Sequence, residues 1–258
     1  MKILVTFALE NEFAPWRAMR EFRADKWGNA NLHLATIAGA EVGVLVTGAG
    51  PRQAQLEFSR AIRGENDSIN FCISSGLAGA LRPEYQIGQV LAARAVFSER
   101  AQTEGKNELL ESSPPLISFA GERATVVDRF YSAERVVARA EEKRHLGATA
   151  DAVEMESFEI LFEAAAAGIP AVAIRAISDT MDEDLPLDMN EVFTDEGQVS
   201  IPRVLGQVAR NPRSLPGLMR LGKNSRVASE SLARFLDSYV GVLAQRIAPL
   251  ETKSSAVG

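Results

Sequence analysis

A single arginine lies inside the most apolar strand-like segment of this 258-residue chain. The run from Ala171 to Ile177 has the length and the β-branched content of a strand that is buried on both faces, as parallel strands usually are, and Arg175 interrupts it. A buried guanidinium is costly unless carboxylates satisfy it, and Glu154 or Glu156 is the expected source. The segment therefore predicts an α/β sheet with an ion pair in its interior.

An acidic residue follows this strand at the point where the strand should end. Asp179 comes directly after Ser178, and ligands of open α/β sheets bind just outside the carboxyl ends of the strands. Upstream, a helix is predicted from Ser157 until Gly168 and Pro170 end it. Asp179 is therefore expected at the mouth of a site. A structural ion pair with an aspartate that caps the next turn is the alternative that spacing alone leaves open.

The amino-terminal segment repeats this arrangement. Residues 2–7 form a predicted buried strand, and Glu10 and Glu12 follow at once, before a helix with one apolar stripe. Two acids at a strand exit are an ordinary helix start, because carboxylates favour the positive end of the helix dipole. Catalysis is the second interpretation of either acid.

Composition narrows the class of protein. Hydrophobic residues make up 46% of the chain, enough for one large α/β domain, and the formal net charge of -6 disfavours a nucleic-acid binder. A small-molecule ligand fits better. The single cysteine, Cys72, lies in an apolar run, and neither a disulfide framework nor zinc-ligand spacing is present. No segment has the length of a spanning helix and no signal peptide is recognised, so we expect a cytoplasmic protein.

Four ordered motifs carry a resemblance to a known family. VEMES at 153–157, RAISD at 175–179, MKILVTFALENEF at the amino terminus, and GAGPRQA followed by SGLAGAL together cover most of residues 1–200. The chain resembles the nucleoside phosphorylase and nucleosidase superfamily, and most closely the branch that hydrolyses 5'-methylthioadenosine and S-adenosylhomocysteine. The resemblance implies a single α/β domain over residues 1–250, with three α/β/α layers and a mixed twisted central sheet.

The same resemblance implies cleavage of a purine N-ribosidic bond and gives roles to individual residues. Asp179 would protonate or hydrogen-bond the purine at N7, and Glu12 would deprotonate the attacking water. Glu156 would accept hydrogen bonds from the ribose hydroxyls. Two residues would support these acids: Arg175 would hold carboxylates in place, and Ser178 would orient Asp179. The other positions would contact the substrate: Met155 would pack against the sugar, Gly76, Leu77 and Ala78 would lie beneath the ribose, and Phe130 and Tyr131 would lie at the base. For the two rings, a place in the core is the competing interpretation.

Two other functions remain open at this point. In phosphorolysis, phosphate would replace water, but Ser74 and Leu77 stand where hexameric phosphorylases carry an Arg and a Ser; Arg17, Arg20 or a neighbouring subunit would have to supply the clamp. A non-catalytic nucleoside-binding protein is the other alternative. The resemblance implies no metal and no organic cofactor, and family habit implies a homodimer.

The chain changes character after residue 200. Residues 203–226 hold six cations and no acid, interleaved with leucines, and a helical extension is expected to about residue 250, with a disordered tail at 251–258. This extension resembles phosphorylase-like proteins associated with hopanoid lipid synthesis, which release adenine from adenosylhopane. A large apolar group at C5' of the substrate and peripheral contact of 203–226 with an anionic membrane face are therefore expected. Solvated cations above core leucines are the plain alternative.

Overall fold

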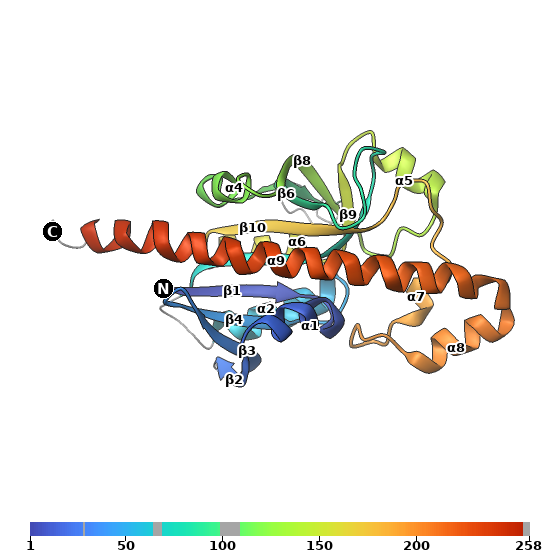
Figure 1. The fold of residues 1–258 in the computed structure, drawn as a ribbon, viewed down its shortest axis with the longest axis horizontal. Helices are drawn as coiled ribbons and strands as arrows, with labels where there is room; N and C mark the ends of the chain where they lie inside the picture. The colour runs from blue at the N-terminus through green and yellow to red at the C-terminus, as the bar shows by residue number, and fades with distance from the viewer. Residues whose placement is uncertain (28, 64–68, 99–108, 255–258) are drawn as a thin grey trace.

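The structure is a computed structural model that describes the whole chain apart from residues 28, 64–68, 99–108 and 255–258 (Figure 1). One sheet contains the strands β1 (Lys2–Phe7), β2 (Arg23–Trp27), β3 (Ala30–Ile37), β4 (Ala40–Val46), β5 (Ile69–Ala80), β6 (Val90–Phe97), β7 (Leu109–Glu111), β8 (Thr125–Ser132), β9 (Ala152–Glu154) and β10 (Ala171–Asp179). The strand order is β10-β6-β8-β9-β5-β1-β4-β3-β2, with β7 paired to β6.

The sheet is mixed, and part of it closes on itself. β5 pairs in parallel with β1 and with β10, whereas β10 pairs antiparallel with β6. Because β10 bonds to both β5 and β6, the strands β5, β10, β6, β8 and β9 form a closed ring, from which β1, β4, β3 and β2 continue as an open sheet. The parallel strands β1, β5 and β10 bring their carboxyl ends to one edge.

Helices cover both faces of the sheet. The helices are α1 (Glu10–Met19), α2 (Pro51–Arg63), α4 (Pro114–Ala120), α5 (Ala140–Leu146), α6 (Ser157–Ala166), α7 (Met189–Val192), α8 (Ile201–Arg210), the 3-10 turn η1 (Pro212–Ser214) and α9 (Leu215–Ser254). Side chains of α1, α4 and α9 form one core with one face of the sheet, and side chains of α2 and α6 form a second core with the other face. Alternate residues of a strand supply these cores, as Val5 and Leu4 do. The expected three-layer α/β architecture is confirmed.

The glycine-rich SGLAGAL motif lies almost entirely in a strand, because β5 continues to Ala80. This part of β5 pairs with β10 on one side and with β9 on the other. The segment therefore forms the wall of the site with strand backbone rather than with a loop.

The carboxyl-terminal part extends beyond the core. In Figure 1, α9 runs along the length of the molecule, and α7 and α8 lie at the end toward which β1 points. α9 reaches Ser254, so the tail expected at 251–258 falls partly in this helix and partly on residues outside the described ones. No residue of α8 is buried. Within the described part of the chain, no helix combines the length and apolarity needed to cross a membrane.

Candidate active site

A cavity of about 240 Å³ opens at the edge where β1, β5 and β10 end. Glu12 enters it from α1, Glu156 from the start of α6 and Asp179 from the end of β10. Its other walls are largely apolar. They include Leu9, Ala49, Leu77, Ala78, Val137, Val153, Met155, Leu185, Met189, Phe193, Val199 and Leu221. The three carboxyls assigned from the sequence thus line one pocket, and so do Met155, Ser178, Leu77 and Ala78.

The buried Arg175 is paired with a carboxylate, as its place in the strand predicted. Arg175 is fully buried, and its Nη2 lies 2.5 Å from Glu154 Oε2 and 3.7 Å from Glu156 Oε2. Its Nη1 donates to the carbonyl of Ser74 at 2.8 Å. Glu154 is therefore the main partner. Because the guanidinium is sealed from the cavity, Arg175 supports the site without reaching a ligand.

Glu156 is held by the glycine turn between β4 and α2. Its Oε1 accepts a hydrogen bond from the backbone N–H of Gly50 at 2.8 Å, so this turn binds a carboxylate of the chain itself. Burial, followed by the neighbouring charge of Glu154, raises the pKa of Glu156 to about 7, against the opposing effect of Arg175. Near neutral pH this carboxyl can therefore exist in either protonation state.

Glu12 caps the start of α1 and also lines the cavity. Its Oε2 accepts from the backbone N–H groups of Ala8 at 3.1 Å and Leu9 at 3.3 Å, which closes the first turn of α1. The same carboxyl lines the cavity, and its burial raises its pKa, which the nearby charge of Arg175 lowers in part. Gly76, at φ +150°, allows this approach, because a Cβ there would lie 3.2 Å from Glu12 Oε2.

Asp179 is bound on both of its oxygens. Ser178 Oγ donates to Oδ2 at 2.9 Å, which is the orienting contact assigned to this serine. The other oxygen, Oδ1, pairs with the ammonium of Lys143 on α5. The side chain of Lys143 is fully buried. Sequence reasoning missed this residue, since a lysine in the charged segment 134–144 has the pattern of a solvated helix face.

The two aromatic residues assigned to the base do not line the cavity. Phe130 is completely buried in the core on the α2 and α6 side, and Tyr131 packs on Phe97 with ring centroids 5.2 Å apart. The competing interpretation, a place in the core, describes Phe130. Among the described residues, the aromatic ring that lines the cavity is Phe193, which follows α7 and belongs to no motif noticed in the sequence.

Cations are scarce in the cavity wall. Arg135 is the one arginine or lysine among the described residues that line it, and it pairs with Glu142 at 2.6 Å. Arg17 pairs with Glu10, and Arg20 binds Asp237 through two hydrogen bonds, so neither reaches the cavity. Across the described residues, no group of His, Cys, Asp and Glu side chains is arranged to hold a metal ion.

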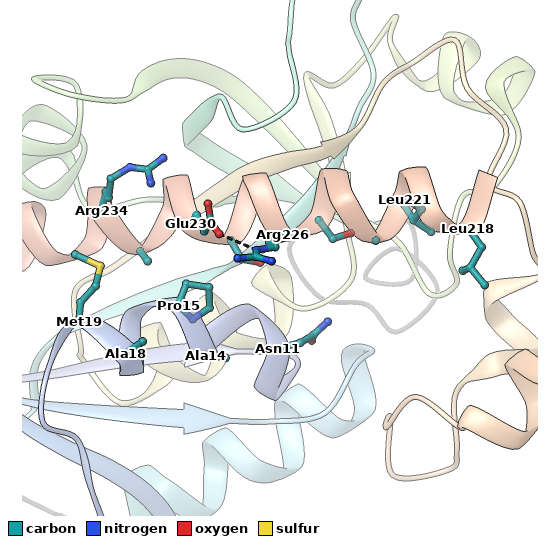
Figure 2. Close-up of a pocket in the computed structure, with 14 residues that line it drawn as sticks. Asn11, Ala14, Pro15, Ala18, Met19, Leu218, Leu221, Arg226, Glu230 and Arg234 are labelled. Carbon is teal, nitrogen blue, oxygen red and sulfur yellow. Dashed lines mark hydrogen bonds and ion pairs between the residues drawn. The ribbon is translucent and has the colours of Figure 1, made fainter. Parts of the chain in front are cut away.

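A second, larger hollow adjoins the cavity. This groove of about 750 Å³ lies between α1 and α9, and Figure 2 shows its walls. Its lining shares Asn11, Leu221 and Ser225 with the cavity, so the two hollows meet there. Its apolar lining residues are mostly small, such as Ala14 and Ala18 of α1, and Arg226, Glu230 and Arg234 of α9 stand along it.

Comparison of the chain with known proteins identifies its family. The family model described as "Phosphorylase superfamily" matches residues 2–210. Among solved structures, 5'-methylthioadenosine/S-adenosylhomocysteine nucleosidase from Helicobacter pylori superposes with a TM-score of 0.72 at 20% identity, over 93% of this chain and 97% of that one. The nucleosidase from Neisseria meningitidis gives 0.72 at 20% identity over 94% and 99%. Futalosine hydrolase from Helicobacter pylori gives 0.71 at 20% identity over 93% and 98%.

At about 20% identity, the solved structures establish that the fold is shared. The family match covers most of the chain and includes the segments that carry Glu12, Glu156 and Asp179. The resemblance noted in the sequence is thereby confirmed. The chain belongs to the phosphorylase superfamily.

Proposed function

We propose that this protein hydrolyses the N-ribosidic bond of a 5'-substituted adenosine and releases adenine. The observation that carries the proposal is the meeting of Glu12, Glu156 and Asp179 in one cavity with apolar walls. Breaking such a bond through an oxocarbenium-like ribose requires an acid at the leaving base and a base at the incoming water. The solved relatives include nucleosidases that are named for 5'-substituted adenosines, which supports the same substrate class here.

In the proposed reaction, the C1'–N9 bond breaks and its electron pair moves onto the purine. Asp179 delivers a proton to N7, which makes the base a neutral leaving group. Glu12 takes a proton from the water that attacks C1'. Glu156 accepts hydrogen bonds from the ribose hydroxyls, and its charge favours the positive ribose. Met155 packs against the sugar, beside the wall formed by Leu77 and Ala78.

Hydrolysis is favoured over phosphorolysis by the scarcity of cations. Phosphate recognition relies on guanidinium or ammonium donors, and Arg135 is the one such side chain among the described lining residues. Ser74 is also unsuitable, because it is fully buried and its Oγ pairs with Ser157 Oγ at 3.0 Å. A water molecule needs no such clamp.

The groove beside the cavity supports a large apolar substituent at C5', as in adenosylhopane. A methylthio group would fit within the 240 Å³ cavity, whereas the 750 Å³ groove offers room for a much longer chain. A homodimer remains part of this proposal.

Access to such a substrate would come from a membrane face formed by 203–226 and the start of α8. Ile201 and Leu205 are each 62% exposed, Met219 is 70% exposed, and no acid occurs between residues 203 and 226. An amphipathic helix with cations and exposed apolar side chains is suited to an anionic bilayer surface. We therefore propose a cytoplasmic protein that rests peripherally on the membrane.

A substrate panel tests the function. Adenine release is measured by liquid chromatography with adenosine, methylthioadenosine, S-adenosylhomocysteine and adenosylhopane in detergent, with Glu12→Gln as the matched inactive control. We expect release from 5'-substituted adenosines, with the highest kcat/KM for the substrate with the large apolar group. If no nucleoside in the panel is cleaved while adenosine analogues still bind, the protein is a nucleoside-binding protein instead. If methylthioadenosine is much faster than adenosylhopane, the lipid assignment is wrong.

A further inference from the structure

The catalytic acid of the proposed reaction is tied to a buried cation. Lys143 is fully buried on α5, and its ammonium pairs with Asp179 Oδ1. The carboxyl of Asp179 faces the cavity with 12% of its side chain exposed. A carboxylate bound to an ammonium can accept a proton but has none to donate. The proton that the leaving base needs must therefore come from elsewhere.

The surroundings of Lys143 account for all three of its N–H groups. Besides Asp179 Oδ1, the ammonium donates to the carbonyl of Thr180 at 3.0 Å and to the carbonyl of Glu183 at 3.2 Å. If one proton moved to Asp179, the neutral amine would keep both carbonyl bonds, and its lone pair would face the new hydroxyl. Both protonation states of the pair are thus fully hydrogen-bonded.

Burial brings these two states closer in free energy. An ion pair loses the hydration of both charges when it is taken out of water, whereas the neutral pair loses much less. Ser178 occupies Oδ2 as a donor, so Oδ1 is the oxygen left to carry a proton. A Cβ at Gly79 would lie 2.9 Å from Oδ1, and the absence of a side chain there leaves this oxygen room.

We propose that Lys143 is a positioning residue for Asp179 and holds the proton that the leaving base takes, an inference that rests on the proposed function. As the C1'–N9 bond breaks, Lys143 gives a proton to Asp179 Oδ1, and Asp179 gives it to N7. Lys143 is left as a neutral amine and Asp179 again as a carboxylate. Glu12 has meanwhile taken a proton from water; it returns that proton to solvent, and Lys143 regains one from solvent.

The other charged groups near the pair have partners of their own. Asp184 accepts from the N–H of Ala140 at 2.8 Å and from Arg139, and these contacts lower its pKa, so it stays a carboxylate. On α5, Glu142 pairs with Arg135 at 2.6 Å. Arg144, the next residue, makes an exposed ion pair with Asp182 at 3.0 Å. Among these groups, Asp179 is the acid that contacts the Lys143 ammonium.

The test compares two substitutions at Lys143 with a neighbouring control. Lys143→Met removes both charge and proton, and Lys143→Arg keeps the charge but cannot release a proton at accessible pH. Arg144→Met removes an exposed ion pair from the same helix to the same loop. For each folded variant, kcat and KM for adenine release are measured from pH 5 to pH 8, with thermal melting to confirm folding.

We expect kcat of both Lys143 variants to fall about 10²–10⁴-fold at pH 7, because general acid catalysis typically accelerates a reaction by that factor. Their KM should change only a few-fold. Asp179→Asn and Asp179→Asn/Lys143→Met should have equal activity, because the two residues act as one unit. Arg144→Met should match the wild type.

Several results would overturn the inference. If Lys143→Arg keeps the full kcat, the positive charge beside Asp179 is what catalysis needs, and proton transfer from Lys143 is excluded. If Lys143→Met keeps the full kcat, Lys143 has no role in catalysis. Multiplying losses in the double variant would show independent action. If Lys143→Met fails to fold, Lys143→Arg carries the test. A wild type that cleaves no nucleoside overturns the proposed function and the inference together, whereas an active wild type with active Lys143 variants overturns the inference alone.

Discussion

Glu154 Oε2 lies 2.5 Å from Arg175 Nη2 in the interior of the sheet, and the same oxygen accepts the N–H of Ser157 at 2.7 Å. One carboxylate thus joins β10, which carries Asp179, to the first turn of α6, beside Glu156. Both side chains of the pair are fully buried. The contact fixes the relative positions of Glu156 and Asp179, two of the three candidate catalytic acids that line the cavity.

Removing one partner of this pair should destabilise the fold. Arg175→Met would leave Glu154 buried without its cation, which costs about 3–5 kcal/mol. Urea denaturation should show that loss in the free energy of unfolding. The matched control is Arg17→Met, which breaks an exposed pair with Glu10 and should change stability by less than about 1 kcal/mol. Equal effects of the two substitutions would mean that the buried pair has no special structural role.

Glu12→Gln should abolish most turnover while the fold is kept. The amide can still accept the N–H groups of Ala8 and Leu9, but it cannot take a proton from water, so kcat should fall about 10²–10⁴-fold. Glu10→Gln is the control, because Glu10 is exposed and does not line the cavity. A folded Glu12→Gln protein with normal kcat would remove Glu12 from the mechanism.

Burial of the Glu12 carboxyl predicts how activity and stability depend on pH. Glu12 must be ionised to accept a proton, and burial raises its pKa above the ordinary 4.5, so kcat/KM should rise with pH on an acid limb that lies above that value. For stability the sign is opposite: the raised pKa of Glu12 contributes stability at low pH, which is lost as pH rises through that pKa. Glu12→Gln should therefore gain stability relative to the wild type only at the higher pH. An acid limb at or below pH 4.5 would contradict this assignment.

The sequence predicted most of the scaffold because local chemistry decides it. The run of buried apolar residues around Arg175 could only be a strand with an internal ion pair, and the acids at strand ends could only lie at the sheet edge. Two acids identified in this way, Glu12 and Asp179, line the cavity, and so does Glu156, whose place in the site came from the family resemblance. What local pattern could not supply was the partner of Asp179, because Lys143 is brought to it from another element across 36 residues.

The aromatic residues near the site could not be predicted from local sequence either. The sequence placed Phe130 and Tyr131 near the base by analogy of position, but alternation along β8 turns Phe130 into the core. Phe193 reaches the cavity because the segment after α7 folds back over the glycine turn, where Ala49 N–H donates to Gly197 O at 2.9 Å. No local signal marks a contact made by a long irregular segment.

A bulky side chain in the groove should lower kcat/KM for substrates with a large C5' group but not for those with a small one. Ala18→Trp adds a large side chain to the groove wall without touching the cavity. We expect kcat/KM for adenosylhopane to fall at least 10-fold, and that for methylthioadenosine on the same variant to stay within about 2-fold, since a bulky side chain in a binding groove excludes ligand by direct overlap. Equal effects on both substrates would show that the groove does not hold the substituent.

The membrane face can be tested by reversing its apolar character. Leu205→Asp should weaken co-sedimentation with vesicles that contain phosphatidylserine, because it places a negative charge on the exposed side of α8. Leu56→Asp, on the exposed side of α2, is the control and should bind like the wild type. Wild-type protein that ignores anionic vesicles at low salt would contradict the proposed contact.

The central claim is that this site cleaves a ribosidic bond with water. The most direct measurement incubates the protein with methylthioadenosine and with adenosylhopane in phosphate-free buffer and in the same buffer with added phosphate, and identifies the sugar product by mass spectrometry. We predict equal amounts of adenine and of the free 5'-substituted ribose, at rates that phosphate does not change. Adenine release only in the presence of phosphate, with a ribose 1-phosphate product, would contradict the claim.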